Sequence, residues 1–203
     1  MKTPFFSAFF TLAILFGSPL SSWAQEAIQV GKVDVKIEYD TQDTPVFEAA
    51  GVKTKKIPYP RNWLEIEVKF DVDARPRDAV IPKLMFKYYV AIQSKEGPAQ
   101  LLTGEVNHVN IVSGEDSYSC AYVSPASLGK ITGDFRRFQK SSVIAVAVAV
   151  FYNGELKGGA SEGKGSGKWW EQMAGSPGII SKDKTPFALL WLDRYSDVEQ
   201  PTR

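Results

Sequence analysis

The chain has 203 residues, with 24 basic and 23 acidic side chains, so its formal net charge at pH 7 is +1. A balance this close to zero gives no electrostatic reason to expect nucleic acid or an anionic membrane as a partner. Cys120 is the only cysteine, which excludes an intramolecular disulfide, and we expect it to be a small buried hydrophobic side chain.

Residues 1–24 have the pattern of a cleaved secretory signal peptide. A lysine near the start supplies the positive charge, residues 5–16 form an apolar stretch, and Ser22 and Ala24 place small side chains before the cleavage point. The apolar stretch is too short to span a bilayer. We therefore predict an exported protein of the periplasm, outer membrane or cell surface. Residues 25–203 are expected to form a single domain without a transmembrane segment.

Alternation of apolar and polar residues predicts five strands in the first part of this domain. They comprise residues 33–39, 64–72, 86–92, 101–112 and 118–123. In the first two, apolar and charged side chains alternate, as expected of strands with one solvated face. Glu65 and Glu67 share such a face with Lys69 and are interpreted as solvated charge. Residues 41–61 show no period and are rich in lysine and proline, which predicts a long surface excursion.

The segment of residues 143–152 is apolar on both faces, which predicts a central strand covered from both sides. The alanines on one of its faces imply close approach by the element that covers them. Asn153 and Gly154 then form a two-residue hairpin turn, because both residue types adopt positive φ readily. Residues 155–161 are expected to return antiparallel.

Three further segments complete the predicted fold. Ser124 is expected to cap a short helix that ends before Gly133, and residues 168–174 are expected to form a second helix. Residues 187–193 are predicted to close the chain as an apolar strand. Eight short strands separated by turns, with at most two short helices, predict an all-β fold of the antiparallel β-sandwich type.

One short motif matches the nucleophile elbow of α/β-hydrolases. Residues 159–163 have the form G-x-S-x-G around Ser161, but the residues that follow do not start a helix well, and the elbow requires a strand followed by a helix. The only histidine, His108, precedes the serine and lies in a predicted strand, whereas the triad histidine should follow it. We therefore expect no catalytic role for Ser161 and predict a protein that is not an enzyme.

No cofactor or metal site is predicted. Lys168 follows a glycine but lacks the upstream glycine and the following Ser or Thr of a phosphate-binding loop. His108 has no second histidine and no acidic cluster to complete a zinc site, so we expect it on a strand surface or satisfied in the core. Asp71, Asp73 and Asp78 supply too few oxygen ligands for a dedicated calcium site.

Tryptophan gives a better indication of a binding surface. Trp169 and Trp170 follow Lys168 at the end of a glycine-rich patch, residues 158–168. They are candidates for an exposed aromatic platform that binds a sugar or a protein partner. Buried aromatic side chains usually seal small β cores, and we favour that role for at least one of the pair. Lys168, Trp169 and Trp170 are therefore the candidate binding residues.

The predicted leader, the strand pattern around residues 63–68 and the block of residues 152–171 resemble a small family of exported proteins from Verrucomicrobia such as Akkermansia. Members are encoded beside type IV pilus-like and secretin genes. The resemblance covers most of the mature chain and implies an immunoglobulin-like sandwich that works in the envelope, in pilus assembly or at the cell surface. It implies no catalytic or ligand residues. Gly17, Ser18 and Pro19 interrupt the apolar run, so an accessory role fits better than a pilin subunit.

We predict a non-enzymatic interaction module that acts through strand-edge pairing or through an aromatic surface patch. Residues 33–39 are the candidate for edge exchange, because a terminal strand can leave at low entropic cost. The expected partners are envelope proteins, among them pilus or secretin components, and not nucleic acid. A glycan-binding adhesin that uses Trp169 and Trp170 is the alternative, and a hydrolase that uses Ser161 is the third hypothesis.

Overall fold

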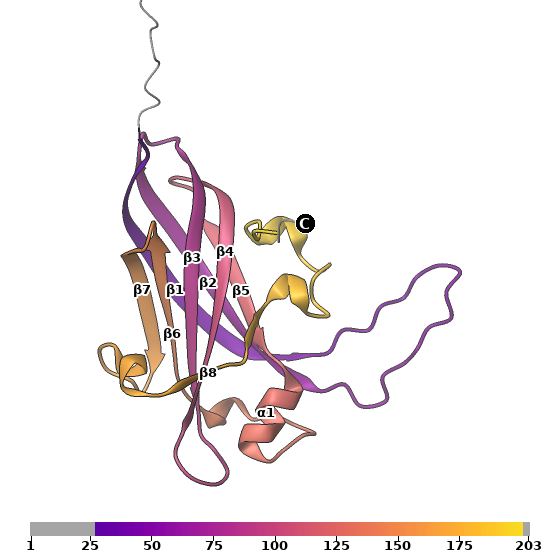
Figure 1. Ribbon diagram of the computed structural model, residues 1–203. Helices are drawn as coiled ribbons and strands as arrows, with labels where there is room; N and C mark the ends of the chain where they lie inside the picture. The colour runs from indigo at the N-terminus through magenta and orange to yellow at the C-terminus, as the bar shows by residue number, and fades with distance from the viewer. Residues whose placement is uncertain (1–26, 201–203) are drawn as a thin grey trace, which may run out of the picture.

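The computed structural model describes residues 27–200, and the predicted leader lies outside these described residues (Figure 1). The strands are β1 (Gln29–Asp43), β2 (Asn62–Arg75), β3 (Val80–Ile92), β4 (Gln100–Val112), β5 (Ser117–Val123), β6 (Val143–Tyr152), β7 (Glu155–Gly163), β8 (Gly175–Pro177) and β9 (Ile179–Ser181). The helical elements are α1 (Pro125–Thr132) and the 3-10 turns η1 (Lys140–Ser142), η2 (Trp169–Gln172), η3 (Lys182–Lys184) and η4 (Leu192–Arg194). The predicted all-β class is confirmed.

The strands form one continuous sheet in the order β8-β4-β3-β6-β7-β1-β2-β5-β9. The sheet folds over itself into two layers (Figure 1). Phe70 of β2 packs against Phe86 of β3 with ring centroids 4.8 Å apart, so these two strands face each other across the core. The layered arrangement fits the predicted sandwich. The sheet is mixed, however, because β1 pairs parallel with β7 and β4 pairs parallel with β8. The immunoglobulin-like detail implied by the resemblance stays a prediction.

The alternating strands extend further than predicted because their apolar pattern continues. In β2, the inward-facing side chains from Leu64 to Ala74 are all buried. Burial of one apolar face removes these side chains from water and fixes the register, because a slip of one residue would turn the charged face inward. Residues 44–61, between β1 and β2, form the predicted excursion (Figure 1).

The central strand β6 is confirmed as buried on both faces. Its valines, among them Val146 and Val148, belong to the main core, whereas Ala145 and Ala147 contact η2 on the other side. Small alanine side chains permit this close approach. Asn153, with φ 48°, and the glycine after it, with φ 83°, form the predicted hairpin turn into β7.

Helix α1 begins and ends as predicted, whereas the second helix is shorter than predicted. The Ser124 hydroxyl accepts a hydrogen bond from the Ser127 N–H at 3.2 Å and caps the first turn of α1. Of the second predicted helix, residues 168–174, only Trp169–Gln172 are helical, as the 3-10 turn η2. The chain turns sharply there to lay its tryptophans on β6 and then extends into β8.

The C-terminal segment, residues 175–200, fills the seam between β4 and β5. β8 pairs with β4, and β9, which begins two residues later, pairs with β5. Further along, the Val109 N–H donates to the Asp197 carbonyl, and the Ser196 N–H donates to the Tyr118 carbonyl. In Figure 1 this segment is the yellow part of the chain, beside β4 and β5. The last part of the chain therefore joins the two outer strands of the layers.

The predicted strand of residues 187–193 is wrong. This segment consists of turns followed by η4, and its backbone N–H groups are used locally, as in the bonds from Ala188 to Thr185 and from Leu190 to Phe187. The edge of β5 is already occupied by β9 along residues 121–123 and by the Ser196 N–H at Tyr118. The apolar side chains of the segment instead attach it to the sheet, because Phe187 packs on Tyr122 of β5.

Cys120 is buried, as predicted for a small hydrophobic side chain. Removal from water raises the pKa of its thiol to about 12. A thiol with this pKa is protonated at neutral pH and is a poor nucleophile.

Candidate functional site

An open strand edge lies between β1 and β7. β1 pairs antiparallel with β2 along its whole length, but it shares only one pair with β7, Val33 with Gly158. Beyond that pair, residues 34–43 and 159–163 have no strand partner on their facing edges within the described chain. Backbone N–H and C=O groups on such edges are free to pair with an added strand.

The prediction that residues 33–39 leave the fold as a terminal strand is wrong. β1 lies in the middle of the sheet order, and its removal would break the whole ladder with β2. It would also expose Val33 and Ile37, which are buried in the core. β1 is therefore fixed, and its unpaired second edge is the feature that remains available.

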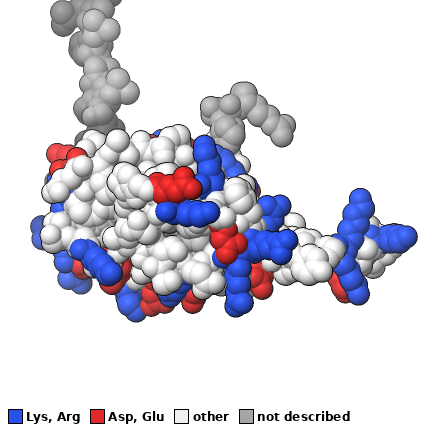
Figure 2. All heavy atoms as spheres, turned by 90° about the horizontal axis from the view of Figure 1, so that it is seen from below, with Lys and Arg blue, Asp and Glu red and all other residues white. Residues whose placement is uncertain are grey.

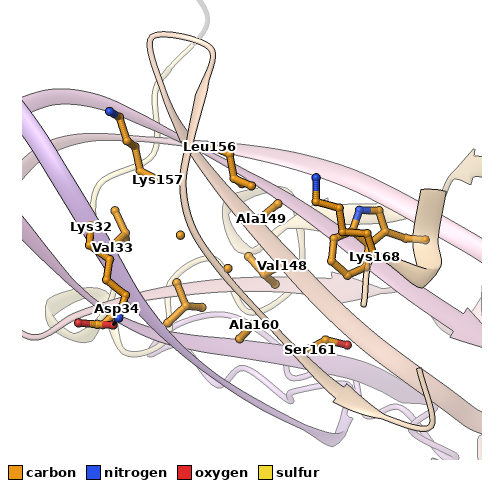
Figure 3. Close-up of a pocket in the computed structure, with 14 residues that line it drawn as sticks. Lys32, Val33, Asp34, Val148, Ala149, Leu156, Lys157, Ala160, Ser161 and Lys168 are labelled. Carbon is orange, nitrogen blue, oxygen red and sulfur yellow. Dashed lines mark ion pairs between the residues drawn. The ribbon is translucent and has the colours of Figure 1, made fainter. Parts of the chain in front are cut away.

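A pocket of about 540 Å³ follows this edge (Figure 3). Its apolar lining is made by Val35, Leu156 and Ala160, with the core valines Val33 and Val148 buried beneath them. Figure 3 shows β1 on one side and the β6–β7 hairpin on the other, with charged side chains at the margin. The volume lies in the range of ordinary binding pockets. An apolar lining beside unpaired backbone is the arrangement that accepts an extended peptide.

Gly158 is what brings the two strands together at one end of this pocket. A Cβ atom at this position would collide with the Val33 carbonyl oxygen. At Gly159, a Cβ atom would lie 2.7 Å from the Val148 carbonyl oxygen. Glycine within a strand marks such close backbone approach. The glycine-rich patch of residues 158–168 therefore indicates this site in the sequence, because two of its glycines permit the close approach of strands. The spacing of the same glycines resembles, but does not complete, a catalytic or a phosphate-binding motif.

The charge along the open edge changes from one end to the other. The charged lining of the first pocket consists of Lys32, Lys157 and Lys168, with Asp34 as its single acid. Lys157 lies 2.8 Å from Glu155, and Lys168 lies 3.3 Å from Glu171. The Glu155 and Glu171 carboxylates are well exposed to solvent, so these ion pairs contribute little to stability.

The second end of the edge is acidic. A smaller pocket there, of about 360 Å³, adjoins Ile37 and Tyr39. Its charged lining consists of Glu38, Asp40, Glu65, Glu67 and Glu162, with Lys140 as the single cation. A strand that follows β1 would therefore meet ammonium groups first and carboxylates later.

The three predicted binding residues do not lie together on one exposed surface. Trp169 is only 8% exposed, packs against the alanine face of β6, and donates from Nε1 to the Ser161 hydroxyl at 2.9 Å. Trp170 stacks on Tyr89 with ring centroids 5.2 Å apart. Lys168 and Trp170 nevertheless line the β1–β7 pocket, together with Ser161. The structure thus brings two of the three predicted residues to the site and buries the third, and it forms no free platform of two tryptophans.

The G-x-S-x-G motif has no nucleophile-elbow geometry. Ser161 lies within strand β7 and its hydroxyl accepts the Trp169 hydrogen bond, whereas an elbow places the serine on a turn before a helix. His108, the histidine that a triad would need, is bound instead to Ser119. The hydrolase hypothesis therefore lacks the contact between serine and histidine that it requires.

His108 is the satisfied core histidine that was one of the two expectations. Its Nδ1 faces the carbonyl oxygens of Ser196 and Asp197, both at 3.1 Å, so this nitrogen carries the proton. Nε2 then accepts from the Ser119 hydroxyl at 2.5 Å, and the Tyr88 hydroxyl donates to Ser119. The network connects β3, β4 and β5 to the C-terminal segment. Burial lowers the pKa of His108 to about 4.

Glu67 is more than the solvated charge that the sequence suggested. Its carboxylate accepts from Arg194 Nε at 3.0 Å and from the Tyr195 hydroxyl at 2.7 Å. The Arg194 guanidinium, above all through these hydrogen bonds, holds the pKa of Glu67 below its usual value. The predicted solvated glutamate therefore attaches the C-terminal segment to β2.

Metal-ligating side chains do not gather in the described part of the chain. Residues 27–200 contain no group of three or more His, Cys, Asp or Glu side chains arranged to hold an ion. Within the same residues, no helix has the length and apolar character needed to cross a membrane.

Comparison with known proteins identifies relatives of most of the chain. A protein-family model matches residues 24–202. The crystal structure of a protein from Akkermansia muciniphila is similar, with a TM-score of 0.73 and 30% sequence identity. The match covers 86% of this chain and 96% of the Akkermansia chain. A search of curated proteins finds no match.

Proposed function

Since the chain belongs to the protein family whose model matches residues 24–202, we propose that it is a non-enzymatic interaction module of the bacterial cell envelope. In this proposal it binds an extended segment of a partner protein along the open edge between β1 and β7. The single observation that supports it is the pairing of these strands at Val33 and Gly158 alone. The strand edges beyond this pair have backbone groups available for an added strand.

The chemistry of the edge describes the segment that would fit it. Backbone hydrogen bonds to β1 and β7 would supply affinity, and alternate side chains would supply specificity. Apolar side chains of the segment would cover Val35, Leu156 and Ala160. Its acidic end would lie beside Lys32 and the other lysines of the first pocket. Its basic end would lie beside the carboxylates of the second pocket.

The envelope context rests on the leader and on the relatives. The pattern of residues 1–24 indicates export, and the similar crystal structure comes from Akkermansia muciniphila, the genus of the resemblance noted in the sequence. With this support we propose that the protein is an accessory subunit of a pilus- or secretin-type assembly. The proposal that it is not an enzyme is supported by the separation of Ser161 from His108, which is bound to Ser119.

A capture experiment tests the site and the partner together. The tagged exported protein is incubated with envelope extract of its own bacterium, and retained proteins are identified by mass spectrometry. Leu156→Arg places a large cation in the pocket at a side chain that is already 49% exposed. We expect it to reduce retention of the partner at least tenfold, because the partner segment can no longer pack against the open edge between β1 and β7.

Leu189→Arg is the matched control, since Leu189 is exposed on the C-terminal segment, away from this pocket. It should retain the partner as the wild type does. Equal retention by Leu156→Arg and wild type would place the partner elsewhere on the surface. Recovery of no pilus or secretin component would count against the proposed assembly.

A further inference from the structure

The excursion of residues 44–61 carries apolar side chains that the fold does not use. Tyr59 is 87% exposed and Val52 is 67% exposed, and Val46, Phe47 and Ile57 are also largely exposed. We call residues 44–61 the arm. The base of the arm is closed by a backbone hydrogen bond, in which the Thr44 N–H donates to the Arg61 carbonyl at 3.1 Å. Loops of this length without secondary structure are uncommon in compact domains and are usually either functional or linker segments.

The arm is also strongly basic. Lys53, Lys55, Lys56 and Arg61 follow its single acid, Glu48, and no acidic residue occurs from there to the start of β2. The near-zero net charge of the chain therefore conceals a segregated positive segment. Figure 2 shows the arm as an extension from the body on which blue spheres gather. The expectation drawn from net charge alone overlooked this separation.

A second segment continues this surface at the base of the arm. Phe135 is largely exposed, and with Arg136, Arg137 and Tyr59 it lines a cavity of about 770 Å³. The Asp134 carboxylate accepts from the backbone N–H groups of both arginines, which holds the backbone of this turn. Asp43 is the only acid that lines the cavity.

We propose that the arm and residues 135–137 dock onto an anionic phospholipid surface. At such a surface, apolar side chains enter the boundary between headgroups and acyl chains while lysines remain among the phosphates. The basic side chains lie between apolar ones, with Val52 before the lysines and Ile57 after them, which fits that boundary. An acidic protein surface would satisfy the cations, but it would leave most of these scattered apolar side chains in water. This inference is independent of the β1–β7 edge.

Vesicle co-sedimentation tests the proposal. The exported protein is mixed with vesicles of neutral phosphatidylcholine or of phosphatidylcholine with 30% phosphatidylglycerol, at low salt. We expect binding to the anionic vesicles and weakening by salt. Neutralising Lys53, Lys55 and Lys56 to Gln should weaken binding roughly 100-fold, at about fivefold for each lysine. Val52→Ser with Tyr59→Ser should also weaken it, through lost apolar burial.

The control removes the same charge from the body of the domain, through Lys32→Gln, Lys36→Gln and Lys83→Gln. These lysines are exposed, and each is paired with a carboxylate. This triple variant should bind the anionic vesicles within threefold of the wild type, and so should Leu156→Arg. Equal binding by the arm variant and the body variant would overturn the proposal. Absence of binding to both vesicles would overturn it in favour of an acidic protein surface.

Discussion

Replacement of Phe187 by Ala is expected to lower the free energy of unfolding by about 3–5 kcal/mol, the usual cost of truncating a buried phenylalanine. The Phe187 ring is buried and stacks on Tyr122, with centroids 4.5 Å apart and planes 3° from parallel. Its edge also meets Trp63 at 5.8 Å. Truncation would leave a cavity between β2, β5 and the C-terminal segment. Urea unfolding followed by tryptophan fluorescence measures this loss.

The consequence should be local as well as global, because Phe187 anchors a segment that covers two strand edges. Limited proteolysis should cut residues 182–200 sooner in Phe187→Ala than in the wild type, since local opening exposes them. Leu189→Ala is the matched control. Its side chain is 74% exposed in the same segment, so a change within about 0.5 kcal/mol is expected. If both variants unfolded at the same urea concentration, the aromatic contact would not be what holds the segment.

The sequence could predict the strands whose pattern is local. β6 and its hairpin are the best case, because apolar residues on both faces and Asn153-Gly154 depend only on near neighbours. The capped helix after Ser124 is another. The predicted strand at residues 187–193 failed for the opposite reason. Whether an apolar segment pairs or turns depends on whether a strand edge is free, and β9 already occupies the edge of β5.

The candidate site could be predicted only in part, because it depends on which strands become neighbours. Lys168 and Trp170 were among the predicted binding residues. The sequence predicted that one tryptophan of the pair is buried and that the alanines of β6 are covered, but it did not show that Trp169 is the side chain that covers them. The pairing of β1 with β7 at Gly158 joins segments more than a hundred residues apart in the chain. Sheet order of this kind is decided by long-range packing, which periodicity does not encode.

Some features of the charge distribution can be predicted from the sequence and others cannot. The lysines of the arm can be counted in the sequence, and only averaging over the whole chain hid them. The ion pair between Glu67 and Arg194 could not be counted in this way. It exists because the C-terminal segment returns to the seam beside β5, and that return is again a property of the whole fold.

Acidification from pH 7 should destabilise the protein through His108 before any carboxylate contributes. The folded-state pKa of His108 is lowered from 6.5 to about 4, because burial disfavours the charged ring. The unfolded chain therefore binds a proton that the native state does not, so the stabilisation is complete above pH 6.5 and is lost as the pH falls towards 4. The expected loss is about 2 kcal/mol at pH 5 and about 3 kcal/mol near pH 4.

The interval from pH 6.5 to 5 isolates this residue, because His108 is the only histidine. Carboxylates with lowered pKa values, such as Glu67 and Glu199, lose their contribution only below their usual pKa of 4.5. Urea unfolding of the wild type at half-unit pH steps should show the free energy of unfolding falling by about 2 kcal/mol by pH 5. His108→Gln should be less stable at pH 7 and nearly flat over this interval, since an amide does not titrate. A wild-type protein equally flat between pH 6.5 and 5 would mean that His108 accepts a proton in the folded state. The bonds that its ring makes to Ser119 and to the carbonyls of residues 196 and 197 would then not hold it neutral.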